Sequence, residues 1–495
     1  MSEIFRNGRL KPTEAEAVKF ISSIKDDEKL LKHVIEINEA HVIMLMEQRI
    51  ITKTDGVKIL NALENFEVGM KIKPWVEDIH VNVEEEVIRV AGEAGENIHI
   101  AKSRNDQVAT AIRMKLREEL IELMETTLKF QEKILKKAEQ KIETVIPSYT
   151  HLRPAQPTTF AHYLLSYFDA FQRNLQRLME CYVRVNMCPM GAAALATTSF
   201  PISRERVAEL LGFAQIVENS LDAVGNRDFV LEALAVLSIM AVDISRLAED
   251  MIIWSTLEFG LIELPDELCS TSSIMPQKKN PDVLEVVRAR MSHVIGNFTI
   301  CTLTLKALPA SYNLDFQEIT PKLWESIDKI KASLDIMAKL IEKCEPNTAP
   351  KNSVLAFSTS TELVNVLVRK YNVPFRTAHK IVGALVRQLI QQKLSLADAT
   401  PEMLRETAKK TANLTLTISA EDLKTALDYN SFLKSHKVRG GPAPAEVKRM
   451  IELRKKLLDS ANAKISEMKL NVVSAHKKLR NFIKKYTEEN APWKT

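Results

Sequence analysis

The amino-acid sequence predicts an all-α protein with an elongated body, and three observations support this fold class. Glycine accounts for only 13 of 495 residues, against a usual share of about 7%, and helix interiors exclude the glycine that sheets and tight turns use. Apolar residues recur at steps of three and four over long stretches, with Glu and Lys on the other faces. The chain is also longer than one core usually holds, so we expect about three domains.

Five stretches carry the helical period and predict a long central bundle. The first ends before Pro147, and the third is apolar nearly all round, which is typical of a central helix. The fourth opens with Asn280-Pro281-Asp282, where Asn is the expected N-cap, Pro takes the first helical position and Asp lies near the positive end of the dipole. The predicted helices are residues 116–142, 160–182, 229–259, 281–305 and 322–344.

Shorter helices on both sides of the bundle complete the expected organisation. We expect residues 1–105 to form an N-terminal helical domain, residues 106–350 the central bundle, and residues 351–495 a C-terminal helical domain with a basic tail. The tail is rich in Lys and Arg, which predicts a solvated basic helix rather than a specific binding arm.

Composition excludes several classes of protein. The 68 Lys and Arg residues against 64 Asp and Glu residues leave a net charge of +4, too small to indicate binding to nucleic acid or to an anionic membrane. The five cysteines are scattered without a CxxC pair, so neither disulfides nor a zinc site is expected. The N-terminus lacks the apolar core of a secretory signal, and the most apolar stretch, Val230–Val242, is too short to cross a bilayer. We therefore expect a soluble cytoplasmic protein.

One loop between predicted helices is unlike an ordinary connector. Residues 270–281 combine hydroxyl groups, backbone amides and two lysines directly before a helix N-terminus. Such a loop is able to hold a carboxylate through amides, the helix dipole and ammonium groups. A surface loop with an Asn-Pro cap explains the same residues equally well.

A second candidate lies at the start of the first long helix. Arg104 offers the fork that binds carboxylates, and Asn105 offers an amide for a polar substrate. The alternative is a capping box from Ser103 to Asp106, which leaves Arg104 and Asn105 unexplained.

Two further segments are candidates. His151 follows an expected helix end, where it suits the role of proton donor, although a lone histidine is more often structural. Residues 219–228 precede the central helix and are either an anion clamp or an N-cap cluster. The sequence contains no GxGxxG, Walker, HExxH or GxSxG motif. We therefore expect proton chemistry on a multiply anionic substrate, with no cofactor and no metal.

Four motifs carry a resemblance to a known family. They are SSIMPQKKNPD at 272–282, SRNDQVAT at 103–110, THL with AQPTTF at 150–160, and NSLDAV with NRDF at 219–229. Together they resemble the argininosuccinate lyase family of the fumarase/aspartase superfamily. The resemblance implies an all-helical homotetramer with a twenty-helix core, in which each site draws on three chains. It implies the reversible anti β-elimination of argininosuccinate to arginine and fumarate, a step of arginine biosynthesis, without a cofactor.

The resemblance also implies roles for individual residues. Ser272 would be the base, His151 the acid or relay, Glu285 the carboxylate that polarises it, and Lys278 a stabiliser of the serine alkoxide and of a substrate carboxylate. The implied substrate-binding residues are Ser23, Asp27, Arg104, Asn105, Thr150, Arg227, Asn280, Tyr312 and Gln317.

The sequence departs from the family pattern at a few positions. Thr271 stands where glycine is usual, and Leu314 and Thr320 stand where members often carry substrate-binding lysines. Two other classes remain as alternatives: a lyase for another fumaryl adduct, such as adenylosuccinate or aspartate, and a catalytically silent structural protein on the same fold. A helical scaffold that binds nucleic acid is a weaker alternative.

Overall fold

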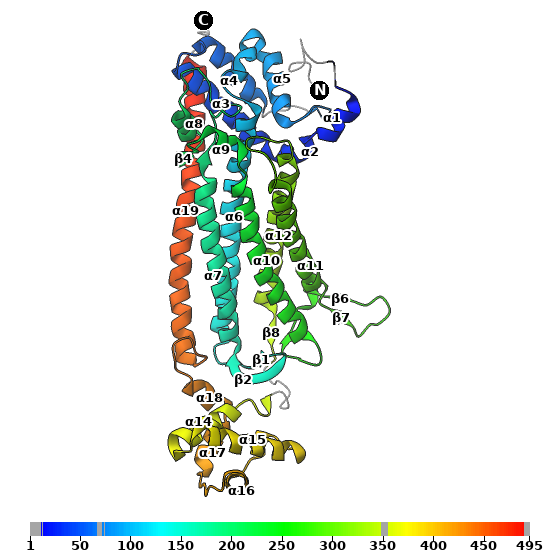
Figure 1. Cartoon of the computed structure of the whole chain (residues 1–495), viewed down its shortest axis with the longest axis vertical. Coiled ribbons are helices and arrows are strands. Elements are labelled where there is room, and N and C mark those ends of the chain that lie inside the picture. Colours follow the sequence, from blue (N-terminus) through cyan, green and yellow to red (C-terminus); the bar gives the residue numbers. More distant parts are fainter. Residues whose placement is uncertain (1–10, 12, 67–71, 74, 348–354, 490–495) are drawn as a thin grey trace.

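The computed structural model describes residues 11, 13–66, 72–73, 75–347 and 355–489, and it is elongated and mostly helical (Figure 1). Long helices run along the middle of the molecule. The N-terminal helices cover one end of this body, and a small helical unit lies beyond the other end (Figure 1). The architecture confirms the predicted all-α class and elongated shape.

The five predicted long helices are present, with shifted ends. They are α6 (Arg104–Gln140), α7 (Phe160–Val185), α10 (Asp228–Ser255), α11 (Asp282–Leu305) and α12 (Phe316–Lys343). Helix α11 begins one residue later than predicted, because Pro281 is its N-cap. Helix α12 begins before Pro321, which therefore lies inside it. Ile319 and Leu323 are fully buried on either side of this proline, and their packing keeps the helix continuous although one hydrogen bond is lost.

The N-terminal helices pack on the end of the bundle and share its core. The helices of this end are α1 (Ala15–Ile21), α2 (Ile24–Asp27), η2 (Glu28–Leu30), α3 (Leu31–Glu47), α4 (Lys53–Phe66), α5 (Ile79–Ala91), η3 (Gly92–His99), α8 (Arg204–Leu210) and α9 (Ser220–Gly225). Strand β3 (Met187–Cys188) pairs in parallel with β4 (Gln215–Ile216) beside α8.

The last helix corrects the predicted C-terminal domain. Helix α19 (Pro444–Glu489) is the longest of the described helices and returns along the bundle (Figure 1). Val447, Ile451, Ile465 and Ile483 are buried in the same core as α6. The basic tail is therefore not a solvated appendage of a 351–495 domain. It is amphipathic, and its apolar stripe is part of the main body.

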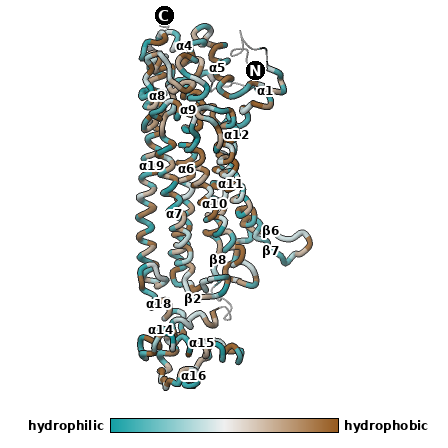
Figure 2. Tube along the Cα trace, viewed as in Figure 1, coloured by the Kyte–Doolittle hydropathy of each residue, from teal (hydrophilic) through white to brown (hydrophobic). Residues whose placement is uncertain are grey.

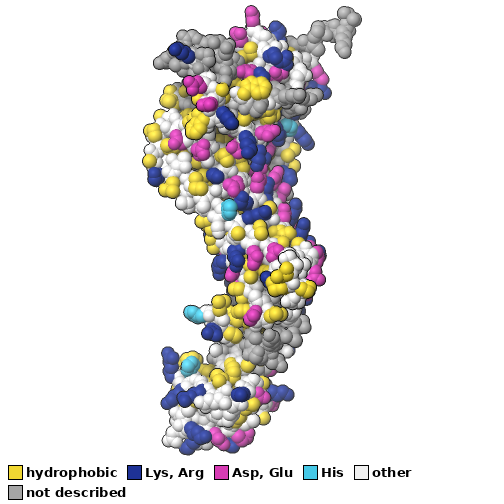
Figure 3. Space-filling model, turned by 90° about the vertical axis from the view of Figure 1, so that its right-hand side faces the viewer, with side chains coloured by type: hydrophobic (Ala, Val, Ile, Leu, Met, Phe, Trp, Pro, Cys, Tyr) yellow, Lys and Arg dark blue, Asp and Glu magenta, His cyan; other side chains and the backbone are white. Residues whose placement is uncertain are grey.

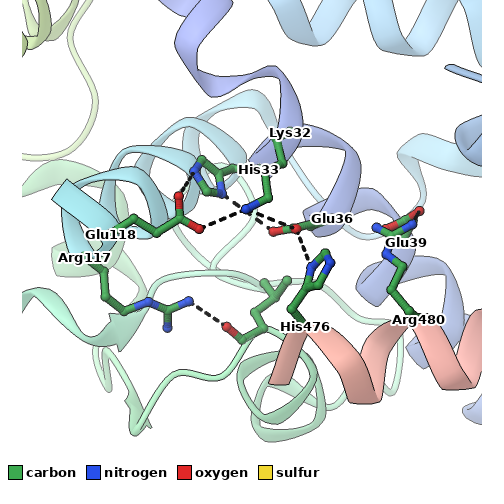
Figure 4. Close-up of polar contacts among 9 residues, drawn as sticks. Lys32, His33, Glu36, Glu39, Arg117, Glu118, His476 and Arg480 are labelled. Carbon is green, nitrogen blue, oxygen red and sulfur yellow. Dashed lines mark hydrogen bonds and ion pairs between the residues drawn. The ribbon is translucent and has the colours of Figure 1, made fainter. Parts of the chain in front are cut away.

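The far end of α19 is joined to the N-terminal helices by a partly buried ion-pair cluster (Figure 4). His476 Nδ1 lies 2.8 Å from Glu36 Oε1, and His33 Nε2 lies 3.3 Å from Glu118 Oε2. Burial alone would lower the pKa of His33, but hydrogen bonds to Glu118 and Glu36 raise it above its ordinary value. Burial would likewise raise the pKa of Glu118, but His33 and Lys32 bring it down to about 2. The charged forms of both His33 and Glu118 are therefore favoured.

The small C-terminal unit has a core of its own. Its helices are α14 (Ser360–Tyr371), α15 (Phe375–Gln391), η5 (Leu396–Asp398), α16 (Pro401–Ala412), α17 (Ala420–Leu427) and α18 (Tyr429–Ser435). Leu363, Ile381 and Leu404 are fully buried in this core, separately from the bundle. We therefore place the end of this unit near Ser435 rather than at the C-terminus.

Two β-hairpins, which the sequence did not predict, interrupt the helices. Strand β1 (Val145–Thr150) pairs antiparallel with β2 (Arg153–Thr159) at the end of the bundle that faces the small unit. Strand β6 (Ser270–Thr271) pairs with β7 (Lys279–Asn280), and the loop between them projects from the body (Figure 1). The tip of this loop is apolar (Figure 2). A further pair joins β5 (Ile262–Glu263) to β8 (Glu345–Pro346), and η4 (Asp266–Leu268) follows β5.

On the face of the molecule that carries the β6–β7 hairpin, neither positive nor negative charge is concentrated in one patch (Figure 3). Basic and acidic side chains intermingle there with apolar ones (Figure 3). Among the described helices, none is both long and apolar enough to cross a bilayer.

Candidate active site

A pocket between α2, α6 and α12 gathers five of the predicted substrate-binding residues. Ser23 and Asp27 come from the first helices, Arg104 opens α6, and the segment around the start of α12 supplies the rest. The five residues on the pocket wall are Ser23, Asp27, Arg104, Tyr312 and Gln317. Because these segments are far apart in sequence, the fold alone brings them together.

The wall of this pocket is rich in carboxylates. Asp26, Glu77 and Asp78 line it together with Asp27. Burial raises the pKa of Asp27 to about 7, and the neighbouring Asp78 and Asp26 carboxylates add to this shift, while a hydrogen bond from Ser23 opposes it. A pocket of this kind suits a cationic ligand group, whose charge would restore the ionised form of Asp27.

Arg104 is engaged within its own chain. Its Nε lies 3.1 Å from Asp78 Oδ2, and its Nη2 lies 3.8 Å from Glu84 Oε2. The guanidinium is therefore oriented by the acidic wall that it partly neutralises. Thr320, at a position where the resembling family often carries lysine, also lines the pocket, while Leu314 is 43% exposed.

Asn105 lies at the start of α6 beside a loop in which Ala193 and Thr197 have positive φ, of 52° and 60°. Its Nδ2 donates to the carbonyl oxygen of Ala194 at 3.0 Å. Ser103 and Asp106 form the predicted capping box, and the fully buried Asp106 carboxylate also accepts from the N–H groups of Gly191 and Ala193, at 3.1 and 2.8 Å. The sequence did not indicate this second role of Asp106, which anchors the loop next to Asn105.

Arg227 lies behind the pocket wall rather than on it. The side chain is buried, and its Nη1 donates to the carbonyl oxygens of Val224 and Asn226 at 3.1 and 2.8 Å. The guanidinium lies over the ring of Phe316, 4.5 Å from its centroid. These contacts cap the C-terminal end of α9, where backbone carbonyls lack partners. Within one chain Arg227 therefore supports the end of α9, and its direct contact with substrate stays a prediction. Asn219 caps the other end of α9.

We expect Arg227→Met to weaken both the fold and the pocket. The change leaves two carbonyl oxygens without their charged donor, which costs about 2 kcal/mol of unfolding free energy. The free Phe316 ring would then disturb Tyr312, which packs edge-on against it at 5.6 Å. Urea unfolding and the KM for substrate measure the two effects. An unchanged KM in a destabilised variant would show that Arg227 supports only the fold.

The β6–β7 loop presents Ser272 to backbone amides. Ser272 Oγ accepts from the N–H groups of Ile274 and Met275, at 3.3 and 3.2 Å. Lys278 is exposed at the other side of the loop, and Asn280 Nδ2 donates to Ser270 Oγ at 3.4 Å. Two amide dipoles aimed at a hydroxyl oxygen favour negative charge on it. The sequence predicted amides around this serine, and the loop provides them.

His151 lies at the tip of the β1–β2 hairpin and not at a helix end. The two turn residues, His151 and Leu152, both have φ near +56°, between the paired residues Thr150 and Arg153. This is the geometry of a two-residue hairpin turn, which non-glycine residues adopt at a cost. The turn exposes His151 and Thr150 to solvent.

One chain does not bring the pocket, the β6–β7 loop and the His151 turn together. Helix α6 has 37 residues and spans about 55 Å, with the pocket at its start and the His151 turn beyond its end. Glu285 is exposed in the first turn of α11, and no described hydrogen bond or ion pair joins it to His151. Among the described residues, no cluster of His, Cys, Asp and Glu is arranged to hold a metal ion.

Comparisons with known proteins define the class. A family model described as lyase matches residues 23–296, and one described as argininosuccinate lyase C-terminal matches residues 357–434. A structure of EDDS lyase in complex with formate aligns with a TM-score of 0.87 at 29% identity and covers 100% of both chains. A class II fumarase from Schistosoma mansoni shares the fold at a TM-score of 0.71 and 16% identity, over 86% of this chain and 95% of its own. The fold is that of the helical lyases of the fumarase/aspartase superfamily.

Sequence relatives narrow this class to one family. The argininosuccinate lyase of Methanothrix thermoacetophila is 43% identical over 482 residues, which cover 96% of this chain and 98% of that protein. The argininosuccinate lyase of Methanocaldococcus jannaschii is 42% identical over 481 residues, 95% of this chain and 98% of its own. The chain belongs to the argininosuccinate lyase family of carbon–nitrogen lyases.

Proposed function

We propose that the protein cleaves argininosuccinate to arginine and fumarate, a reaction of arginine biosynthesis, in sites shared by the chains of a homotetramer. The observation that carries this proposal is the acidic pocket around Ser23, Asp27, Arg104, Tyr312 and Gln317. Its carboxylates suit the guanidinium of the arginine end, and the same carboxylates would repel a substrate with a second succinyl group in that position.

The succinyl end would meet the β6–β7 loop. Elimination begins with removal of a proton from the carbon beside a carboxylate, which builds up negative charge on that carboxylate. Ser272 is the base in this proposal, because its Oγ already accepts two backbone N–H groups that would stabilise an alkoxide. Lys278 and Asn280 would bind the succinyl carboxylates on the same loop. The C–N bond then breaks, and a proton passes from His151, polarised by Glu285, to the leaving nitrogen. Thr150 would assist in binding the substrate.

Assembly from three chains follows from the separation of these groups. One chain would supply the pocket, a second the β6–β7 loop and a third the His151 turn. Apolar side chains that one chain leaves exposed on its bundle helices support such an assembly. On α10 and α11 they are Ile239, Val242, Val286, Ile295, Ile300 and Leu303. An isolated monomer with full activity would contradict the shared site.

The pKa of Asp27 gives a prediction about substrate affinity. Asp27 titrates near pH 7 without substrate, because burial raises its pKa to about 7. The guanidinium binds the carboxylate form, so the KM for argininosuccinate should be lowest above pH 7 and rise as the pH falls below it. Asp27→Asn should raise the KM at high pH and flatten this dependence. The measurement is a KM series across pH for both proteins, and parallel profiles would remove Asp27 from the guanidinium contact.

The direct test of the function is release of fumarate, followed by its ultraviolet absorbance. We expect release from argininosuccinate, and little from adenylosuccinate, from aspartate or from an aspartate that carries a second N-linked succinyl group. Release from one of these three alone would replace the substrate but keep the class of reaction. No release from any substrate would favour a structural role for the chain.

A further inference from the structure

One histidine outside the predicted site joins the His151 hairpin to the junction with the small C-terminal unit. His162 lies in the first turn of α7, directly after β2. Its Nδ1 is 2.8 Å from Thr158 Oγ1 on β2, and its Nε2 is 2.9 Å from the carbonyl oxygen of Gly440. A carbonyl oxygen only accepts, so Nε2 carries the proton and Nδ1 accepts from the threonine hydroxyl. One neutral tautomer therefore satisfies both contacts.

The Gly440 end of this link is a fixed point. Gly440 has φ of +85° and donates its N–H to Glu446 Oε1 at 2.7 Å. Gly441 follows it in a turn so tight that an added Cβ would lie 2.5 Å from the carbonyl oxygen of His436. This turn joins α18 of the small unit to α19 of the main body. Its backbone is thus held in place exactly where the two parts of the chain meet.

The hairpin end of the link lies near the base of the hairpin whose tip carries His151. Thr158 pairs with Ile146 near the base of the hairpin, and Gln156 Nε2 makes a second contact with Thr361 Oγ1 of α14 at 3.2 Å. About five residues of strand separate Thr158 from the turn, a length of about 17 Å. A tilt of about 3° at the base would move the tip by about 1 Å, enough to cost a catalytic group much of its effect.

We propose that His162 is a positioning residue for the elimination: by bridging Thr158 and Gly440 it sets the angle of the His151 hairpin and couples the C-terminal unit to the catalytic acid. This inference rests on the proposed function for the identity of the acid. It predicts that kcat depends on a hydrogen-bond donor to the carbonyl oxygen of Gly440 and not on the imidazole ring itself. The second tie, between Gln156 and Thr361, holds the same hairpin against the small unit.

Two substitutions separate the two bonds of His162. In His162→Gln the amide nitrogen reaches the Nε2 position and keeps the donor to Gly440, whereas in His162→Asn the amide oxygen keeps only the acceptor for Thr158. We expect His162→Asn to lower kcat by about 10- to 100-fold with little change in KM, and His162→Gln to recover most of it. Melting temperatures of both variants report any general loss of stability.

A readout without turnover completes the test. Hydrogen exchange of residues 145–159 should be faster in His162→Asn than in wild type, and close to wild type in His162→Gln. Equal kcat in His162→Asn and wild type would overturn the proposal, as would an equal loss in both variants that tracks their melting temperatures. If wild type releases no fumarate from argininosuccinate, the proposed function fails. The link between His162 and Gly440 is rejected by a separate result, which is unchanged hydrogen exchange of residues 145–159 in His162→Asn.

Discussion

Replacing Ser272 by alanine is expected to abolish fumarate release almost completely. The serine hydroxyl is the only proposed acceptor for the proton on the succinyl carbon, and a positioned general base contributes about 10²- to 10⁴-fold. The KM should change little, because Lys278 and Asn280 would still bind the carboxylates. The experiment compares kcat of wild type and Ser272→Ala with argininosuccinate under saturating conditions.

Ser273→Ala is the matched control for this experiment. Ser273 is the next residue of the same loop, is exposed, and has no backbone N–H directed at its hydroxyl among the described hydrogen bonds. Its replacement by alanine also removes one hydroxyl group from the loop, and it should leave kcat near that of wild type. Full activity in Ser272→Ala would remove this serine from the role of base, and equal losses in both variants would point to the conformation of the loop instead.

The long helices of the body could be predicted from the sequence, because helical periodicity depends only on residues that are close together in the chain. A period of three and four residues over many turns predicted the ends of α7, α10 and α11 to within four residues, whereas α6 begins at Arg104, twelve residues before its predicted start. The β1–β2 hairpin had no such signal, since Pro147, Pro154 and Pro157 interrupt it and a strand of this length gives little periodicity. A hairpin at this place depends on pairing across the turn, which a single-sequence period does not contain.

The basic tail shows how charge masked a signal that was present. Lys and Arg dominate the end of α19, yet Val447, Ile451, Ile465 and Ile483 recur on one face and are buried. A count of apolar positions at helical spacing would have found this stripe. The charged face alone predicts a solvated helix, whereas the apolar stripe on the opposite face places α19 in the core.

The structure brings five of the predicted site residues together in one pocket, and their roles stay predictions. Arg227 has the chemistry of an anion-binding residue, and its use as the cap of α9 became visible only when that helix met Phe316 of α12. The orienting contact of Arg104 with Asp78 likewise joins segments remote in sequence. Residue type limits what a side chain is able to bind, and tertiary packing selects among the possibilities.

Two inactive variants are expected to restore each other when their chains mix. In a mixture of Ser272→Ala and His151→Asn chains, a shared site is able to take its β6–β7 loop from one variant and its His151 turn from the other. With equal amounts and random assembly, about a quarter of the sites would carry both original residues. Co-expression of the two variants, followed by purification of the mixed assembly, should therefore recover part of the wild-type fumarate release.

The control mixes Ser272→Ala with Lys278→Ala, whose altered residues lie on the same loop. Ser272 and Lys278 are separated only by the loop between β6 and β7, so every site receives both from one chain, and no combination of these two variants contains an intact loop. Recovery in the first mixture and none in the second is the result expected if the β6–β7 loop and the His151 turn of one site come from different chains. Recovery in both mixtures would mean that one site takes Ser272 and Lys278 from different chains. No recovery in either would mean that one chain supplies both the β6–β7 loop and the His151 turn of a site.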